Sequence, residues 1–494
     1  MGIQKIKALK GKKMTAKIHN QIKKISNTLS ITQDSFLGEL FVRGQDPVLH
    51  SPHYIGESTA TLLALFGMEL SAAWYKRTGL IEDVSVDVNK AVIQLGSIFF
   101  NRQNGTTIEY EDKGLVGTTD FFKCKDNRWV YIVCSTPSLR QKACSVLNCQ
   151  STKEAFESAC LQWNAQELEE AILKVDGACS MVLTRKEWLN SEQYPFTMKN
   201  ELIQVDKITD TDVKAFLPNP KKPLSGIKVL DNTHILAGPL SGRYLADAGA
   251  DVLRILPPSY TNPVIMEMET IGGKHSTWLD LKKEDKKQAF FELIKDADVF
   301  LNSYLNLEGM GITPESLMKI NPSLVYVDLT AYGKEGPWAK RGGFEQHGQS
   351  VTGFSLAEGT IDQPANPPTY LMNDVMCGLE AAIGAVDALR QRAEQGGGYY
   401  VQISLSRNCD WVQEFGLIER EKIQHLPESL IHNPGLGGTL REEFLLPTHT
   451  TPLGPLGEMS FLPLQIEFSC LNIVPEWSGE PNGASKPTWD VFKN

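Results

Sequence analysis

From Gly226 onward the sequence alternates short apolar runs with amphipathic runs of helical spacing, and this alternation constrains the fold more than any other feature. The runs "GIKVLD", "DVLRIL", "TWLDL", "DVFLNSY" and "SLVYVDLTAYG" have the length and composition of strands. Between them lie helical stretches such as "GPLSGRYLADAGA" and "EDKKQAFFELIKDA". Strands joined by helices of this length require right-handed crossovers. The sequence therefore predicts an α/β fold with a doubly wound parallel sheet.

A second helix–glycine–strand unit lies near the start of the chain. The segment "NDVMCGLEAAIGAVDALRQRAEQGGGYYVQISL" predicts a long helix, a glycine stop and a strand, and "TATLLALFGMELSAAWYKRTGLIEDVSVDV" has the same order. Gly67 and Gly384 are 317 positions apart, and so are Gly79 and Gly396. This register predicts an internal duplication. An accidental match of two amphipathic helices is the alternative.

The composition excludes several classes of protein. At 494 residues the chain is long enough for several domains. The net charge of −10 disfavours a nucleic-acid surface, and no apolar run approaches the roughly 20 residues that a membrane span needs. The nine cysteines are scattered without CxxC or Cys/His spacing. We therefore expect no metal site, and reduced thiols in a cytoplasmic protein.

The two ends of the chain differ in character from the middle. The opening "MGIQKIKALKGKKMTAKIHNQIKKIS" carries many lysines and no acid before Asp34, which predicts a disordered or frayed basic tail. A mitochondrial presequence is the alternative, although such a segment favours arginine and serine. From about Glu414 the sequence is rich in proline and glycine and weakly periodic. It predicts an extended arm or a loosely structured tail.

The stretch "HILAGPLSGRYLADAGADVLRI" raises the question of a nucleotide site. The dinucleotide fingerprint GxGxxG is absent and no acid ends the second strand, so a nicotinamide enzyme is disfavoured. What remains is a helix N-terminus whose free N–H groups suit a phosphate or another anion. Lys274 stands just before the strand "TWLDL" and is a candidate phosphate contact, although exposed lysines are common.

Asp374 opens the otherwise apolar or small run "NDVMCGLEAA" and allows two interpretations. Aspartate is a favoured helix N-cap and contributes about 1 kcal/mol there. The alternative is chemistry at the mouth of a buried helix. The nearby segment "FEQHGQSVTG" gathers Glu345, His347 and Gln349 between glycines, but a lone histidine is more often a surface or core residue than a catalytic one.

Five ordered motifs between about Gly226 and Trp411 resemble the family III CoA-transferases, which include formyl-CoA transferase, carnitine CoA-transferase and alpha-methylacyl-CoA racemase. The segment "GGKHSTWLDLKKEDKK" resembles the family's "GKRSVALDLK", "DADVFLNSY" its "ADVVVENF", and "AYGKEGPWAKRGGFEQHGQSVTG" its "GYGQTGPYADRPGFDLVAQALSG". The opening strand–helix–strand and the helix that begins near Asp374 match as well. Residues 52–200 resemble the second half of the family, so the chain is similar to two-copy fungal members.

The resemblance implies roles for particular residues. Asp374 matches the catalytic aspartate, and Glu57 takes its place in the first copy, where we expect a degenerate site. The positions that match CoA contacts are His234, Ala237 and Lys274 and, more weakly, Tyr304 and Met310.

Several positions depart from the family pattern. Leu236 replaces a glutamine or valine, Leu256 replaces an acid, and Pro257 stands where an arginine can contact CoA. Ser303 replaces an asparagine. Phe344 occupies the position of the catalytic histidine in the racemase branch, so a racemase or isomerase is a weak alternative.

The resemblance implies transfer of CoA between an acyl-CoA and a carboxylic acid through an aspartyl anhydride and an aspartyl-CoA thioester. Coenzyme A would be a substrate and not a tightly bound cofactor. The partners would be small molecules, without nucleic acid or membrane, and a homodimer is possible because relatives form interlocked dimers. A CoA-binding pseudoenzyme is the second alternative.

We divide the chain into four parts on the same grounds. Residues 1–50 are a basic tail and lead-in, residues 51–205 a degenerate second-half copy, residues 225–412 a Rossmann-like CoA-binding half with the catalytic Asp region, and residues 413–494 a truncated arm. The resemblance also implies a smaller α+β domain beside the sheet.

Overall fold

The computed structural model describes residues 14–31, 35–108, 117–369, 371–432 and 439–493. Its centre is a seven-stranded sheet in the order β11-β10-β9-β12-β13-β14-β8. The strands are β8 (Gln204–Lys207), β9 (Lys228–Asn232), β10 (Asp251–Leu256), β11 (Lys274–Trp278), β12 (Val299–Asn302), β13 (Val325–Thr330) and β14 (Tyr399–Ser404). Every pair in it is parallel except β14 with β8. The predicted mixed α/β fold with a parallel sheet is confirmed.

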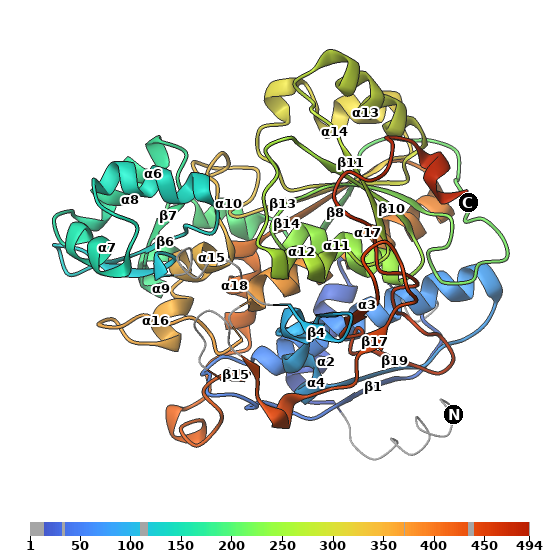
Figure 1. Cartoon of the computed structure of the whole chain (residues 1–494). Coiled ribbons are helices and arrows are strands. Elements are labelled where there is room, and N and C mark those ends of the chain that lie inside the picture. Colours follow the sequence, from blue (N-terminus) through green and yellow to red (C-terminus); the bar gives the residue numbers. More distant parts are fainter. Residues whose placement is uncertain (1–13, 32–34, 109–116, 370, 433–438, 494) are drawn as a thin grey trace.

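Helices cover both faces of this sheet (Figure 1). One face packs against α11 (Ala237–Asp247) and α17 (Met372–Gln395), and the other against α13 (Glu284–Asp296) and α14 (Pro314–Ile320). Successive strand residues point to opposite faces, so Val229 lies in the first core and Leu230 in the second. Both faces of the sheet are buried against helices, which explains why these strands are continuous apolar runs in the sequence.

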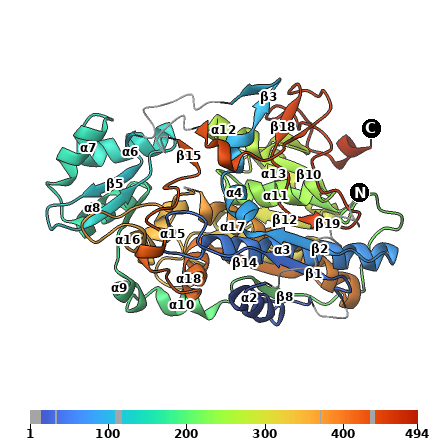
Figure 2. The same cartoon turned by 90° about the horizontal axis from the view of Figure 1, so that it is seen from below.

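A smaller lobe lies to one side of the sheet in both ribbon views (Figures 1 and 2). It contains β5 (Asp120–Lys123), β6 (Trp129–Ile132) and β7 (Cys179–Met181) with α6 (Pro137–Leu147), α7 (Lys153–Cys160) and α8 (Ala165–Lys174). The strands are antiparallel and the lobe has its own apolar core. Residues 51–94, which we grouped with this lobe, pack instead into the core of the large sheet.

The two segments with matching glycines have the same geometry. Helix α3 (Ile55–Thr78) and helix α17 both span 24 residues, and they pack against each other. Each ends at a glycine of positive φ, Gly79 or Gly396. Strands β2 (Val84–Asp87) and β14 follow, and then helices α4 (Val88–Gln94) and α18 (Leu405–Glu414) begin 317 positions apart.

The ends of the chain are more ordered than we expected. Helix α2 (Ala16–Ser26) is capped by the Thr15 hydroxyl and buries Ile18, Ile22 and Ile25 in the main core. The expectation of a frayed tail is therefore wrong from residue 14 onward, and its first 13 residues lie outside the described part. At the other end, the extended arm is held by strand pairing: β18 (Met459–Phe461) joins β3 (Arg102–Gln103), and β19 (Glu467–Phe468) joins β2.

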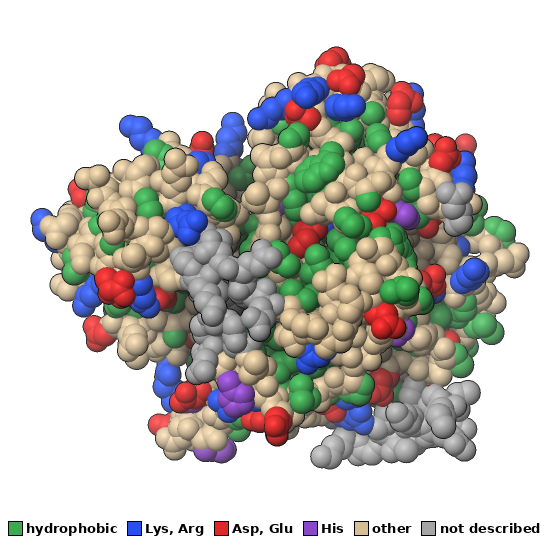
Figure 3. All heavy atoms as spheres, in the orientation of Figure 1, with side chains coloured by type: hydrophobic (Ala, Val, Ile, Leu, Met, Phe, Trp, Pro, Cys, Tyr) green, Lys and Arg blue, Asp and Glu red, His purple; other side chains and the backbone are tan. Residues whose placement is uncertain are grey.

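Two features bear on the charge and the apolar character of the described residues. Basic and acidic side chains are interspersed on the face drawn in Figure 3. Among the described residues, no helix combines the length and the apolar character that a membrane crossing requires.

Candidate active site

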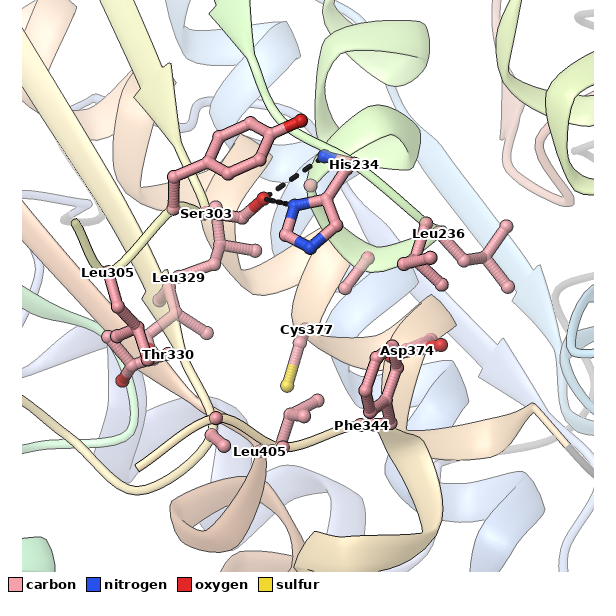
Figure 4. Close-up of a pocket in the computed structure, with 18 of the residues that line it drawn as sticks. His234, Leu236, Ser303, Leu305, Leu329, Thr330, Phe344, Asp374, Cys377 and Leu405 are labelled. Carbon is pink, nitrogen blue, oxygen red and sulfur yellow. Dashed lines mark hydrogen bonds between the residues drawn. The ribbon is translucent and has the colours of Figure 1, made fainter. Parts of the chain in front are cut away.

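A pocket of about 310 Å³ opens at the carboxyl ends of the parallel strands. It lies where the strand order turns back, because His234 follows β9 and Ser303 follows the neighbouring strand β12. Open α/β sheets bind ligands at this point. Other walls come from the ends of β13 and β14, from residues 341–344 and from the first turns of α17 (Figure 4).

Asp374 faces this pocket and does not cap its own helix. It is the third residue of α17, and the N-cap residue of that helix makes no side-chain cap bond. The carboxylate of Glu345 caps α17 instead. Glu345 is the first residue of α15 (Glu345–Val351). It accepts the backbone N–H of Asn373 at 2.9 Å and the backbone N–H of Asp374. The carboxylate of Asp374 is thereby left to line the pocket.

The two carboxyl groups have strongly perturbed acidities. Burial raises the pKa of Asp374 to about 7. Burial, followed by the neighbouring charge of Asp374, raises the pKa of Glu345 well above its usual range. Asp374 lies in the first turn of α17, so desolvation outweighs the helix dipole here. Near neutral pH the pair retains at least part of a proton.

His234 is fixed on the opposite side of the pocket by the loop after β12. Its backbone N–H donates to the Ser303 hydroxyl at 3.1 Å, and its Nδ1 lies 3.0 Å from the same oxygen (Figure 4). Its ring stacks on Tyr304 with 4.3 Å between centroids. Burial lowers the pKa of His234 to about 4, so the imidazole is neutral at physiological pH. Ala237, the first residue of α11, also lines the pocket.

Ile235, between His234 and the start of α11, has a strained backbone. Its φ is 67°, in the left-handed region that β-branched residues avoid. Its carbonyl accepts a hydrogen bond from Asn262 Nδ2 at 2.9 Å. Strain of this kind is held in place by the surrounding structure and clusters at functional sites. No feature of the sequence indicated it.

Two residues that we expected to contact CoA lie elsewhere. Lys274 is fully buried, and its ammonium donates to Asp231 Oδ2 at 2.9 Å and to the Pro239 carbonyl at 2.6 Å. It therefore joins β9, β11 and the start of α11. Met310 ends the short helix η2 (Glu308–Met310), and its carbonyl accepts from Lys287 Nζ at 2.6 Å. Neither residue lines the pocket, so a CoA contact for them has no support in this arrangement.

The structure also brings residues to the site for which we predicted no role there. Arg341, Phe344 and Cys377 line the pocket. Glu345 stood out as an acid between glycines, but only the fold brings it to the helix N-terminus. His347 from the same segment is buried, and its Nδ1 accepts the Phe344 N–H at 3.1 Å.

Part of the chain is similar to known proteins. A sequence model of CoA-transferase family III matches residues 224–435. The acetyl-coenzyme A transferase nodX of Hypoxylon pulicicidum is 33% identical over 203 residues, which make up 39% of this chain and 34% of that protein. The acetyl-CoA:oxalate CoA-transferase of Acetobacter aceti is 30% identical over 203 residues, 38% of this chain and 51% of that protein.

A crystal structure of Rv3272 from Mycobacterium tuberculosis is 31% identical, with a TM-score of 0.38, and the match covers 40% of this chain and 58% of that one. The chain spans about a third to a half of the length of the two curated relatives described above. Residues 224–435, which carry the parallel strands and the pocket, are thus similar to CoA-transferase family III.

Proposed function

We propose that the protein transfers CoA between an acyl-CoA and a carboxylic acid, with Asp374 as the covalent nucleophile. The observation that carries this proposal is that two different acids cap the start of α17 and face the pocket, respectively. Glu345 satisfies the helix N–H groups, and Asp374 is left with its carboxylate in the pocket. The names of the matched relatives support CoA transfer in general terms.

In the proposed reaction the Asp374 carboxylate attacks the thioester carbonyl of the donor. The C–S bond breaks, CoA leaves as the thiolate, and an acyl-aspartyl anhydride remains. The thiolate then attacks the aspartyl carbonyl and releases the first carboxylic acid, which leaves an aspartyl-CoA thioester. The acceptor carboxylate attacks this thioester, and the returning thiolate takes the new acyl group and frees Asp374.

Each of these steps passes through a tetrahedral oxyanion that requires hydrogen-bond donors. The backbone N–H groups of Asn373 and Asp374 are already bound to Glu345, so the N-terminus of α17 is a poor source of these donors. Gly342 and Gly343 line the pocket, and we assign the oxyanion contacts to their N–H groups.

We further propose that α3, β2 and α4 are a degenerate duplicate of α17, β14 and α18. The capping arrangement is repeated: Asp46 Oδ2 accepts the Glu57 N–H at 2.7 Å, and Asp46 Oδ1 accepts the Gly56 N–H at 3.3 Å. Asp46 thus corresponds to Glu345, and Glu57 to Asp374. Glu57 Oε2 is occupied by the Thr15 hydroxyl at 2.7 Å, which suits packing better than catalysis.

One observation weakens the expected CoA contacts and so keeps a pseudoenzyme as the alternative. Lys274, the expected phosphate contact, is held in a buried ion pair with Asp231. A racemase is less well supported, because Phe344 lines the pocket where that chemistry needs a base.

The test is intact-protein mass spectrometry after incubation with a panel of acyl-CoAs and trapping with hydroxylamine or borohydride. We expect modification confined to the peptide that holds Asp374 and lost in Asp374→Asn, which keeps the shape of the side chain. Glu57→Gln is the matched control and should react like the unmodified protein. A folded protein that forms no adduct with any donor would leave the pseudoenzyme as the answer.

A further inference from the structure

The pocket around Asp374 offers a substrate mostly apolar walls. Leu236, Phe344, Cys377 and Leu405 share the pocket with the carboxylate (Figure 4). Among the described residues, the pocket lining contains one positively charged group, the guanidinium of Arg341. A substrate with a second carboxylate would need a cation here, because a buried charge without a partner is costly.

Arg341 is not available as that cation, because the smaller lobe already neutralises it. Its Nη2 donates to Glu169 Oε1, on helix α8, and to the Cys179 carbonyl at 3.3 Å. Both charged side chains are nearly buried, with 10% and 12% of their surface exposed.

Further contacts fix both members of this ion pair in place. The guanidinium carbon lies 4.8 Å from the centroid of the Trp338 ring and 5.4 Å from that of Tyr332. The same Glu169 oxygen accepts the Met181 N–H at 2.6 Å. The pair is therefore a built part of the structure and not a mobile surface contact.

We propose that the acyl group is apolar and monocarboxylic, and that Glu169 determines this specificity by withholding Arg341 from a second substrate carboxylate. The proposal rests on the transferase function above and names its substrate class. Glu169 does not touch the reacting atoms, so it acts on the choice of substrate through Arg341.

The test compares two donors of equal length, hexanoyl-CoA and adipyl-CoA, which differ at the far end in a methyl group or a carboxylate. Each is incubated with its own ¹³C-labelled free acid, so that CoA exchange is measured without knowledge of the natural acceptor. We expect kcat/KM to be about 100-fold higher for hexanoyl-CoA than for adipyl-CoA, because the far carboxylate of adipyl-CoA would be buried without a partner. Equal or faster exchange with adipyl-CoA would overturn the proposal and leave the transferase function intact.

The variant Glu169→Gln tests the role of the ion pair directly. Glutamine keeps an oxygen that can accept the Met181 N–H. It removes the negative charge that neutralises Arg341. The ratio of adipyl to hexanoyl exchange should rise about tenfold. Glu167→Gln, on the exposed side of the same helix, is the matched control and should leave the ratio unchanged.

Two outcomes of this experiment speak against the proposal in different ways. An unchanged ratio in Glu169→Gln removes Glu169 as the specificity determinant. The absence of exchange with every donor, in a folded protein, refutes the transferase function and this inference with it.

Discussion

The carboxylate of Glu345 caps the helix in which Asp374 stands, accepting the Asn373 N–H at 2.9 Å and the N–H of Asp374 itself. A single acid thus fixes the start of α17 and leaves the acid beside it free to face the pocket. Burial raises the pKa of both carboxyl groups, and the neighbouring charge of Asp374 adds to the shift of Glu345.

Replacing Glu345 should separate its capping role from its charge. Glu345→Ala removes the cap and should lower the free energy of unfolding by about 1–2 kcal/mol, measured by urea denaturation. Glu345→Gln keeps one acceptor and should cost less. Because burial alone raises the pKa of Asp374, the acid limb of the pH–rate profile should stay in place in Glu345→Gln. A limb that moves to lower pH would show that a negative charge on Glu345 contributes to the shift.

Adduct formation should depend on pH through Asp374. Its pKa of about 7 means that the carboxylate is largely protonated, and so not nucleophilic, below that value. Single-turnover acylation should therefore rise about tenfold per pH unit below 7 and level off above it. The measurement is the initial rate of adduct formation between pH 5 and 9, with protein fluorescence as a check that the fold persists. A flat profile would contradict the raised pKa.

Relieving the strain at Ile235 should stabilise the protein and weaken ligand binding. Glycine adopts a φ of 67° without penalty, so Ile235→Gly should raise the free energy of unfolding by about 1 kcal/mol after the entropy cost of glycine. The looser turn should raise KM for the acyl-CoA. Ile361→Gly, at an exposed site, is the control and should not stabilise. Destabilisation by Ile235→Gly would mean that side-chain packing outweighs the strain.

The two matching glycines should respond alike to substitution. A Cβ on Gly67 would lie 2.6 Å from Val84 Cγ1, and one on Gly384 would lie 2.5 Å from Val401 Cγ1. Each alanine variant should lose about 1–3 kcal/mol by overpacking, measured by thermal unfolding.

Two further variants test the cause of that loss. Gly309→Ala, where a Cβ meets nothing within 4 Å, should be nearly neutral. Combining Gly67→Ala with Val84→Ala should cost about 1 kcal/mol less than the sum of the two single changes. Strict additivity would rule out the close contact as the cause.

Much of the architecture follows from local sequence patterns. The sequence alone predicts the apolar runs of β9, β10 and β13 and the glycine stops after α3 and α17. It also predicts the 317-residue register between those two helices. Period, turn residues and β-branched content act over a few residues, so they predict elements and their order. His234, Ala237, Tyr304 and Asp374, which the motifs single out, lie around one pocket, and their roles stay predictions.

The contacts that define the chemistry depend on segments far apart in the chain. Glu345 caps a helix that begins 27 positions later, at Met372. Arg341 forms an ion pair with Glu169 of the smaller lobe, and Lys274 forms one with Asp231. Each contact depends on which polar groups the packed elements bring together. Burial then set the pKa of Asp374, because desolvation is a property of the assembled core and not of the residues beside it in the sequence.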